Sequence, residues 1–78
     1  MARILIADDN RQITSILEEY AKKDGHTTLL AFNGEEALSL FRSGDPDLIL
    51  LDVMMPKIDG FEVCREIRKT SSVPIIMI

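Results

Sequence analysis

The sequence predicts an α/β domain in which a parallel sheet carries helices on both faces. Short apolar runs without charge alternate along the chain with longer stretches whose apolar residues recur every three or four positions. Apolar runs that are too short for a helix and are bounded by turn formers are typical of strands inside a parallel sheet. The resulting β-α-β-α-β-α-β order implies a parallel sheet with right-handed crossover connections.

The central strand is expected at Leu48–Leu51, which leads directly into Asp52. Because the run carries no charge, we expect this strand to be buried on both faces. The carboxyl ends of strands in open α/β sheets are where ligands bind, so Asp52 is the first candidate site residue. The other expected strands are Ile4–Ala7, Thr27–Phe32 and Val73–Ile78.

Three amphipathic helices are expected between these strands. Asn10 can cap the first helix and Gly25 can stop it. Its expected apolar stripe consists of Ile13, Ile16, Leu17, Tyr20 and Ala21. The second helix begins near Glu35 and Glu36, whose carboxylates favour the positive end of the helix dipole, and Gly44 closes it.

The third helix is expected to begin after Asp59, a capping residue type, and to lead into a short polar linker. The expected inward residues of this helix are Phe61, Val63, Cys64 and Ile67. We interpret Asp59 as a cap rather than a ligand, and Lys57 in the preceding loop as a solvated charge.

Length and composition limit the classes of protein that need to be considered. The 78 residues allow one small domain, and the net charge of −4 argues against nucleic acid as a direct partner. The single cysteine, Cys64, cannot form an internal disulfide. No apolar run approaches the ~20 residues that a membrane helix needs, and Met1 leads into a strand without a signal peptide. We therefore expect a cytoplasmic protein with no membrane partner.

Three carboxylates are candidates for one metal site. Asp8 and Asp9 follow the first strand and Asp52 follows the third. If those strands are neighbours, the acids converge, and their mutual repulsion favours a bound cation. Mg²⁺ fits best because it prefers oxygen ligands and commonly pairs carboxylates with phosphate. Zinc does not fit, because Cys64 and His26 are single and lack ligand spacing.

A carboxylate next to such a metal can attack a phosphoryl group and form an acyl phosphate. Phosphoryl transfer mainly needs alignment and charge neutralisation, which a metal held between acids supplies. Two other classes fit less well. A hydrolase of the dehalogenase type needs a second aspartate two residues after the nucleophile, where Met54 stands. A nucleotide-binding half-domain needs a glycine-rich turn after the first strand, where Asp8 and Asp9 stand.

Five residues form a distinctive pattern: the pair Asp8 and Asp9, then Asp52, and Pro56 and Gly60 four and eight positions beyond Asp52. The last three lie within LILLDVMMPKIDGFEV. With this pattern the chain resembles the receiver domain of two-component response regulators (CheY-like). The resemblance implies a flavodoxin-like, doubly wound sheet with strand order 2-1-3-4-5.

The resemblance also implies the function and the site. In this family the residue at Asp52 accepts a phosphoryl group from a sensor histidine kinase, and the domain is not an enzyme in its own right. The carboxylates of Asp8, Asp9 and Asp52 and the backbone carbonyl of Met54 would bind Mg²⁺.

The chain covers only part of the family's domain. We expect residues 1–78 to be a receiver truncated after strand four, lacking a final helix-strand-helix. A threonine or serine that follows strand four in the family would lie just beyond Ile78, and a lysine after strand five is also absent. Efficient phosphorylation is therefore expected to be impaired.

The alternative is a non-catalytic, truncated module that associates with itself. Without a fifth strand, Val73–Ile78 becomes an uncharged sheet edge with unpaired backbone groups, which is a template for another strand. The apolar stripe of the first helix would also lose part of its cover. We therefore expect a homo-oligomer, most simply a homodimer, formed by edge pairing or by segment exchange.

Overall fold

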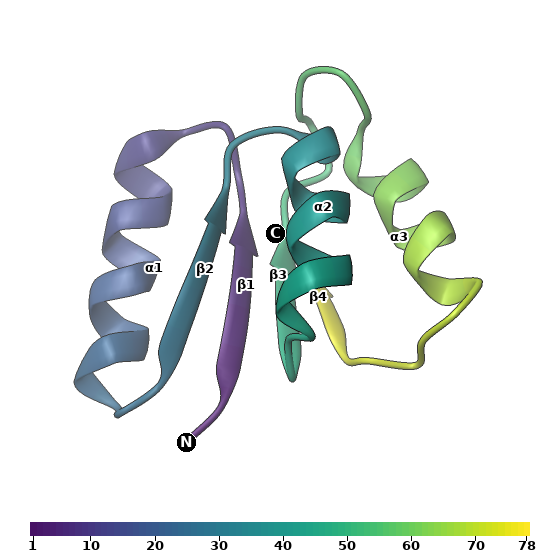
Figure 1. Ribbon diagram of the computed structural model, residues 1–78. Coiled ribbons are helices and arrows are strands. Elements are labelled where there is room, and N and C mark those ends of the chain that lie inside the picture. Colours follow the sequence, from purple (N-terminus) through teal and green to yellow (C-terminus); the bar gives the residue numbers. More distant parts are fainter.

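The computed structural model describes residues 1–78 as four strands and three helices that alternate along the chain (Figure 1). The elements are β1 (Arg3–Ala7), α1 (Arg11–Lys23), β2 (Thr27–Ala31), α2 (Gly34–Gly44), β3 (Leu48–Leu51), α3 (Gly60–Arg68) and β4 (Ile75–Met77). None of the helices is both long and apolar enough to cross a membrane.

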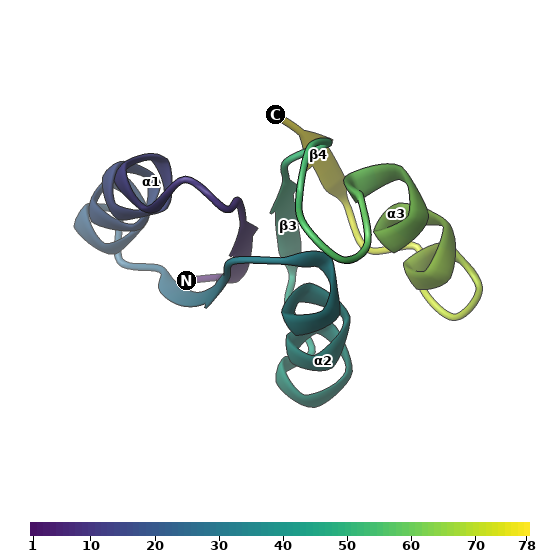
Figure 2. The ribbon, with the colours of Figure 1, turned by 90° about the horizontal axis from the view of Figure 1, so that it is seen from above.

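The strands form one parallel sheet in the order β2-β1-β3-β4. Figure 2 shows α1 on one face of this sheet and α2 and α3 on the other. The fold class and the strand order expected for a flavodoxin-like sheet are confirmed for these four strands. The order makes β1 and β3 neighbours although a helix, a strand and a second helix separate them in sequence.

The main core lies between the sheet and the helices α2 and α3. Its fully buried residues come from every strand except β4, and burial of each large aliphatic side chain contributes about 1.5–3 kcal/mol. The core residues are Leu5, Ala7, Ala31, Ala37, Leu38, Ile49, Leu51, Met55, Val63 and Ile67.

The opposite face of the sheet is only partly covered, which corrects two expectations. In β3, Ile49 and Leu51 are buried, but Leu48 and Leu50 are only half-buried, so this strand is not buried on both faces. On α1, Ile13, Ile16 and Tyr20 are exposed instead of packed. The physical reason is that α1 alone covers this face, next to β1 and β2, and leaves the area over β3 and β4 open (Figure 2).

The helix ends follow the side-chain chemistry that the sequence indicates. The Oδ1 atom of Asn10 accepts hydrogen bonds from the amides of Gln12 and Ile13, and Asn33 caps α2 in the same way. Gly25 has a φ of +83°, which a residue with a side chain rarely adopts, so it stops α1 as expected.

The ends of three strands and one helix face differ from the prediction. The strand β1 begins at Arg3, one residue before Ile4, β2 ends at Ala31, one residue before Phe32, and β4 is confined to Ile75–Met77. Phe61 was expected to point inward but is 60% exposed. At 3.6 residues per turn it lies about 100° around α3 from the buried Gly60, away from the face that contains Ile67.

Candidate functional site

The three acids lie together at the carboxyl ends of β1 and β3, at the top of Figure 1. Ala7 and Leu51 are partners in the sheet, and the amide of Asp52 donates a 2.8 Å hydrogen bond to the carbonyl oxygen of Ala7. This register brings Asp8 and Asp52 to the same edge. One carboxylate oxygen from each of Asp8, Asp9 and Asp52 lies within 4.8 Å of the others, so the predicted convergence is confirmed.

Asp8 has the most unusual environment of the three. It is only 7% exposed, whereas Asp9 is exposed and Asp52 is half-buried. Burial raises the pKa of Asp8 above its usual value, and the neighbouring carboxylates of Asp52 and Asp9 raise it further. The amide of Asn10, which donates to Asp8 Oδ1 over 2.9 Å, opposes this rise. The site therefore disfavours its own negative charge and favours a cation.

The donor set fits magnesium. Three clustered carboxylates supply the hard oxygen ligands that Mg²⁺ prefers, and Mg²⁺ keeps its remaining positions for water or phosphate. Cys64 is half-buried on α3, and His26 accepts a 2.9 Å hydrogen bond from the amide of Ala2 near the amino end of β1. Neither residue joins the acids, which agrees with the exclusion of zinc.

The backbone of Met54 lies beside Asp52, while its side chain is largely exposed. The amide of Met54 donates a hydrogen bond to Asp52 Oδ1 over 3.3 Å. This contact orients one oxygen of Asp52 and keeps the Met54 peptide next to the acids. The exposed side chain has no role in the site, so only the backbone of Met54 is a candidate ligand.

The β3–α3 loop leaves and rejoins the fold through a narrow base. The amide of Gly60 donates to the carbonyl oxygen of Val53 over 2.8 Å. A Cβ atom at Gly60 would overlap the carbonyl oxygen of Asp52, so only glycine allows α3 to begin here. Asp59 caps α3 by accepting a 3.0 Å hydrogen bond from the amide of Glu62. Its interpretation as a cap is confirmed.

The tip of the same loop holds a tight turn that the sequence did not indicate. Ile58 donates its amide to the carbonyl oxygen of Pro56 over 2.9 Å, which closes a γ-turn around Lys57. Lys57 has a φ of +71°, a region that costs a residue with a side chain about 1–3 kcal/mol. Its side chain is largely exposed and lies 3.9 Å from a carboxylate oxygen of Glu35, as expected for a solvated charge.

The comparisons with known proteins agree with this geometry. Residues 4–78 match the response regulator receiver domain. The chain is 51% identical over 76 residues to the probable transcriptional regulator ycf27 of Guillardia theta, a match that covers 97% of this chain and 30% of that protein. Over 500 curated proteins match significantly, and the first of them are ycf27 regulators that this chain spans to less than a third of their length.

Solved receiver domains superpose closely on the whole chain. The receiver domain of the Francisella response regulator 1452 has a TM-score of 0.93 and 33% identity, and the match covers 99% of this chain and 64% of that one. The BeF3-activated receiver domain of Klebsiella pneumoniae RstA has a TM-score of 0.92 and 28% identity, and the match covers 96% of this chain and 64% of that one.

Proposed function

The chain belongs to the response regulator receiver family, and from that premise we propose that Asp52 is the phosphoacceptor of a two-component phosphorelay. The phosphoryl group would come from a sensor histidine kinase, the partner that membership of this family implies. The observation that carries the proposal is the position of Asp52 after β3, with oxygens of Asp8 and Asp9 within 4.8 Å. Receiver domains are in general not classical enzymes, and here the chain would itself be the substrate.

The chemistry required of Asp52 is nucleophilic. One of its carboxylate oxygens would form a bond to phosphorus while the bond between phosphorus and the imidazole nitrogen of the kinase histidine breaks. The imidazole leaves with that electron pair, and the product is an acyl phosphate. The hydrogen bond from the Met54 amide to Asp52 Oδ1 supports this role because it limits the rotation of the nucleophile.

Receiver domains of response regulators generally bind Mg²⁺ at acidic residues. For this chain we propose the ligands Asp8, Asp9 and Asp52 together with the backbone carbonyl of Met54. A bound Mg²⁺ would neutralise the charge of the acids and of the phosphoryl oxygens. Burial and, after it, the neighbouring carboxylates raise the pKa of Asp8, which supports the proposal because a bound cation offsets the negative charge that this environment disfavours.

We further propose that residues 1–78 correspond to the amino-terminal part of a receiver domain. The 64% coverage of solved receiver domains supports this extent. The hydroxyl and lysine side chains that contact the phosphoryl group in the family would lie outside residues 1–78. Phosphorylation of residues 1–78 by themselves should therefore be slower than that of a longer receiver.

Acetyl phosphate and Mg²⁺ provide a test without the kinase. Incubation followed by intact mass measurement should show the gain of one phosphoryl group, located by peptide mapping at Asp52. A longer receiver domain treated in parallel serves as the positive control. An unchanged mass for this chain, under conditions that label the control, would contradict residual phosphoacceptor activity.

A second function, self-association, is favoured by the exposed apolar face. The edge strand β4 pairs only with β3, and Ile76 is 52% exposed. On α1, Ile16 is 51% exposed and Tyr20 is 67% exposed. A second copy of this chain could pair with the free edge of β4 and cover both surfaces, which supports a homodimer.

Light scattering coupled to gel filtration tests this second function. The chain should elute as a dimer at micromolar concentration, and Ile76→Lys should shift it to a monomer because a charge on an edge strand opposes pairing. Thr70→Lys adds the same charge at an exposed position in the α3–β4 linker and should leave the dimer intact. A cooperatively folded wild-type monomer would refute self-association.

A further inference from the structure

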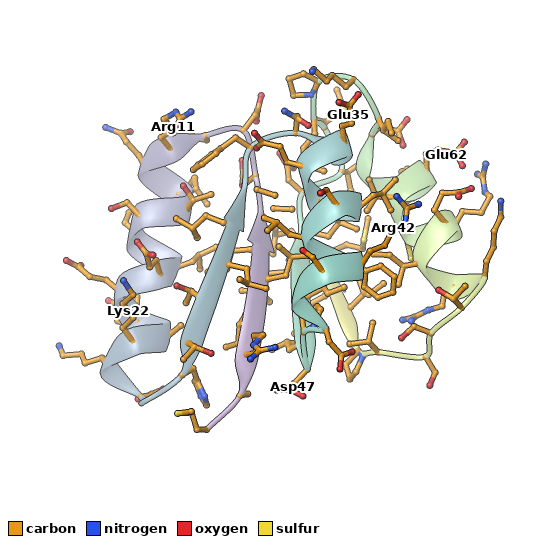
Figure 3. The ribbon with its side chains drawn as sticks, viewed as in Figure 1. Arg11, Lys22, Glu35, Arg42, Asp47 and Glu62 are labelled. Carbon is orange, nitrogen blue, oxygen red and sulfur yellow. The ribbon has the colours of Figure 1, made fainter.

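The start of α2 contacts the tip of the β3–α3 loop. The amide of Gly34 donates a 3.4 Å hydrogen bond to the carbonyl oxygen of Pro56, the same oxygen that accepts the amide of Ile58 and closes the γ-turn. Figure 3 shows Glu35, the next residue of α2, directly below this loop. The first turn of α2 therefore supports the loop segment around Lys57, where the backbone has a positive φ.

This contact depends on the missing side chain of Gly34. A Cβ atom at this position would overlap the carbonyl oxygen of Ile58 and crowd its Cβ atom. Gly34 has no positive φ, so the glycine is needed for space and not for backbone conformation. The ion pair between Lys57 and Glu35 is too exposed to hold the loop by itself.

The loop is thus fixed at two places, with Met54 and Met55 between them. Its base is closed by the hydrogen bond from Gly60 to Val53, and its tip by the hydrogen bond from Gly34 to Pro56. Met55 is buried in the main core. These restraints leave the Met54 peptide little freedom to rotate away from Asp52.

We propose that Gly34 is a positioning residue for the Asp52 site. Its bare Cα lets α2 hold the γ-turn, and the γ-turn limits the rotation of the Met54 peptide, whose amide donates to Asp52 Oδ1. The effect of Gly34 on the metal rests on the proposed Mg²⁺ site, whereas its effect on the loop does not. Gly34 touches neither the acids nor any group that reacts.

Gly34→Ala tests the proposal, and Gly44→Ala is the matched control. Gly44 is the last residue of the same helix. A Cβ atom added there would meet Cδ1 of Leu29, the end of a side chain that can rotate away from the added atom. In the metal-free protein, Gly34→Ala should shift the amide NMR signals of residues 54–58, and Gly44→Ala should not. In calorimetry with Mg²⁺ alone, Gly34→Ala should weaken binding about 10-fold or more, as loss of a supporting contact typically does.

Lys57→Pro provides a second variant that leaves α2 unchanged. Proline holds φ near −65° and cannot adopt the +71° of Lys57, so the loop must leave its present conformation. It should weaken Mg²⁺ binding to a similar degree. The proposal would be overturned if the amide NMR signals of residues 54–58 in Gly34→Ala matched those of the wild type. It would also be overturned if these signals shifted while the Mg²⁺ affinity stayed at the wild-type value. A wild-type chain that binds no Mg²⁺ would refute the metal site, while the metal-free signals would still decide the role of Gly34 in the loop.

Discussion

The backbone amide of Asp52 donates to the carbonyl oxygen of Ala7 over 2.8 Å, directly before Asp8. This single hydrogen bond joins two strand ends that lie more than forty residues apart in sequence. Asp8 and Asp52 therefore lie side by side because β1 and β3 are neighbours, not because of any local motif. The chemistry of the site follows from that pairing, since each carboxylate alone is an ordinary loop acid.

The first prediction concerns the nucleophile. Asp52→Asn removes the attacking oxygen's charge while keeping the acceptor of the Met54 amide, so labelling by acetyl phosphate should be abolished. The matched control is Asp59→Asn, the same substitution in the same loop. Asparagine caps helices as well as aspartate does, so this control should stay folded and labelled. Labelling of Asp52→Asn at the wild-type level would show that another residue accepts the phosphoryl group.

Local chemistry explains why much of the fold could be predicted from the sequence. Asn10 and Asp59 cap helices through hydrogen bonds to amides two or three residues away, and Gly25 ends a helix through its own backbone conformation. Such local effects can be predicted from adjacent residues in the sequence. The apolar runs likewise mark the strands, because a parallel sheet buries them. Convergence of the acids needed one further assumption, that β1 and β3 are neighbours.

The features that could not be predicted depend on what packs against each element. The apolar stripe of α1 identifies a face suited to burial, but not whether anything covers it, and Tyr20 is in fact 67% exposed. The γ-turn at Lys57 had no signal, because a lysine does not favour positive φ and the supporting contact with Gly34 joins residues that are far apart in sequence.

The second prediction concerns the metal. Asp9→Asn removes an exposed carboxylate from the cluster, so Mg²⁺ binding measured by calorimetry should be lost or weakened about 10-fold or more. Asp24→Asn makes the same charge change at the far end of α1 and should leave the affinity unchanged. Equal loss in both variants would mean that net charge, and not a defined site, governs the binding.

The third prediction concerns the dependence of stability on pH through Asp8. Its folded-state pKa is raised, so the folded state holds this proton more tightly than the unfolded state. The contribution of Asp8 to stability is therefore greatest below the usual pKa of 3.8 and is lost as the pH rises through the higher folded value. Asp8→Asn cannot ionise and keeps an acceptor for the Asn10 amide, so at pH 7 in a chelator it should be more stable than the wild type.

Urea unfolding in the presence of a chelator, at pH 7 and at pH 3, measures the difference in stability between Asp8→Asn and the wild type. The advantage of Asp8→Asn should disappear at the lower pH, where Asp8 is itself protonated. Mg²⁺ should stabilise the wild type by mass action and leave the variant unchanged. A variant less stable than the wild type at pH 7 without metal would show that the ionised Asp8 carboxylate is well accommodated.

The last prediction tests the corrected face of α3. Ile67 is fully buried in the main core, whereas Phe61 is exposed on the same helix. Ile67→Val removes one buried methylene and should lower the free energy of unfolding by about 0.5–1.5 kcal/mol. Phe61→Ala removes a much larger side chain but should change it by no more than about 0.5 kcal/mol, as for other surface positions. Urea unfolding of both variants measures the difference. A larger loss for Phe61→Ala would place its ring in a packed environment, either within this chain or against a second copy, and unfolding at several protein concentrations would separate these two cases because only the second depends on concentration.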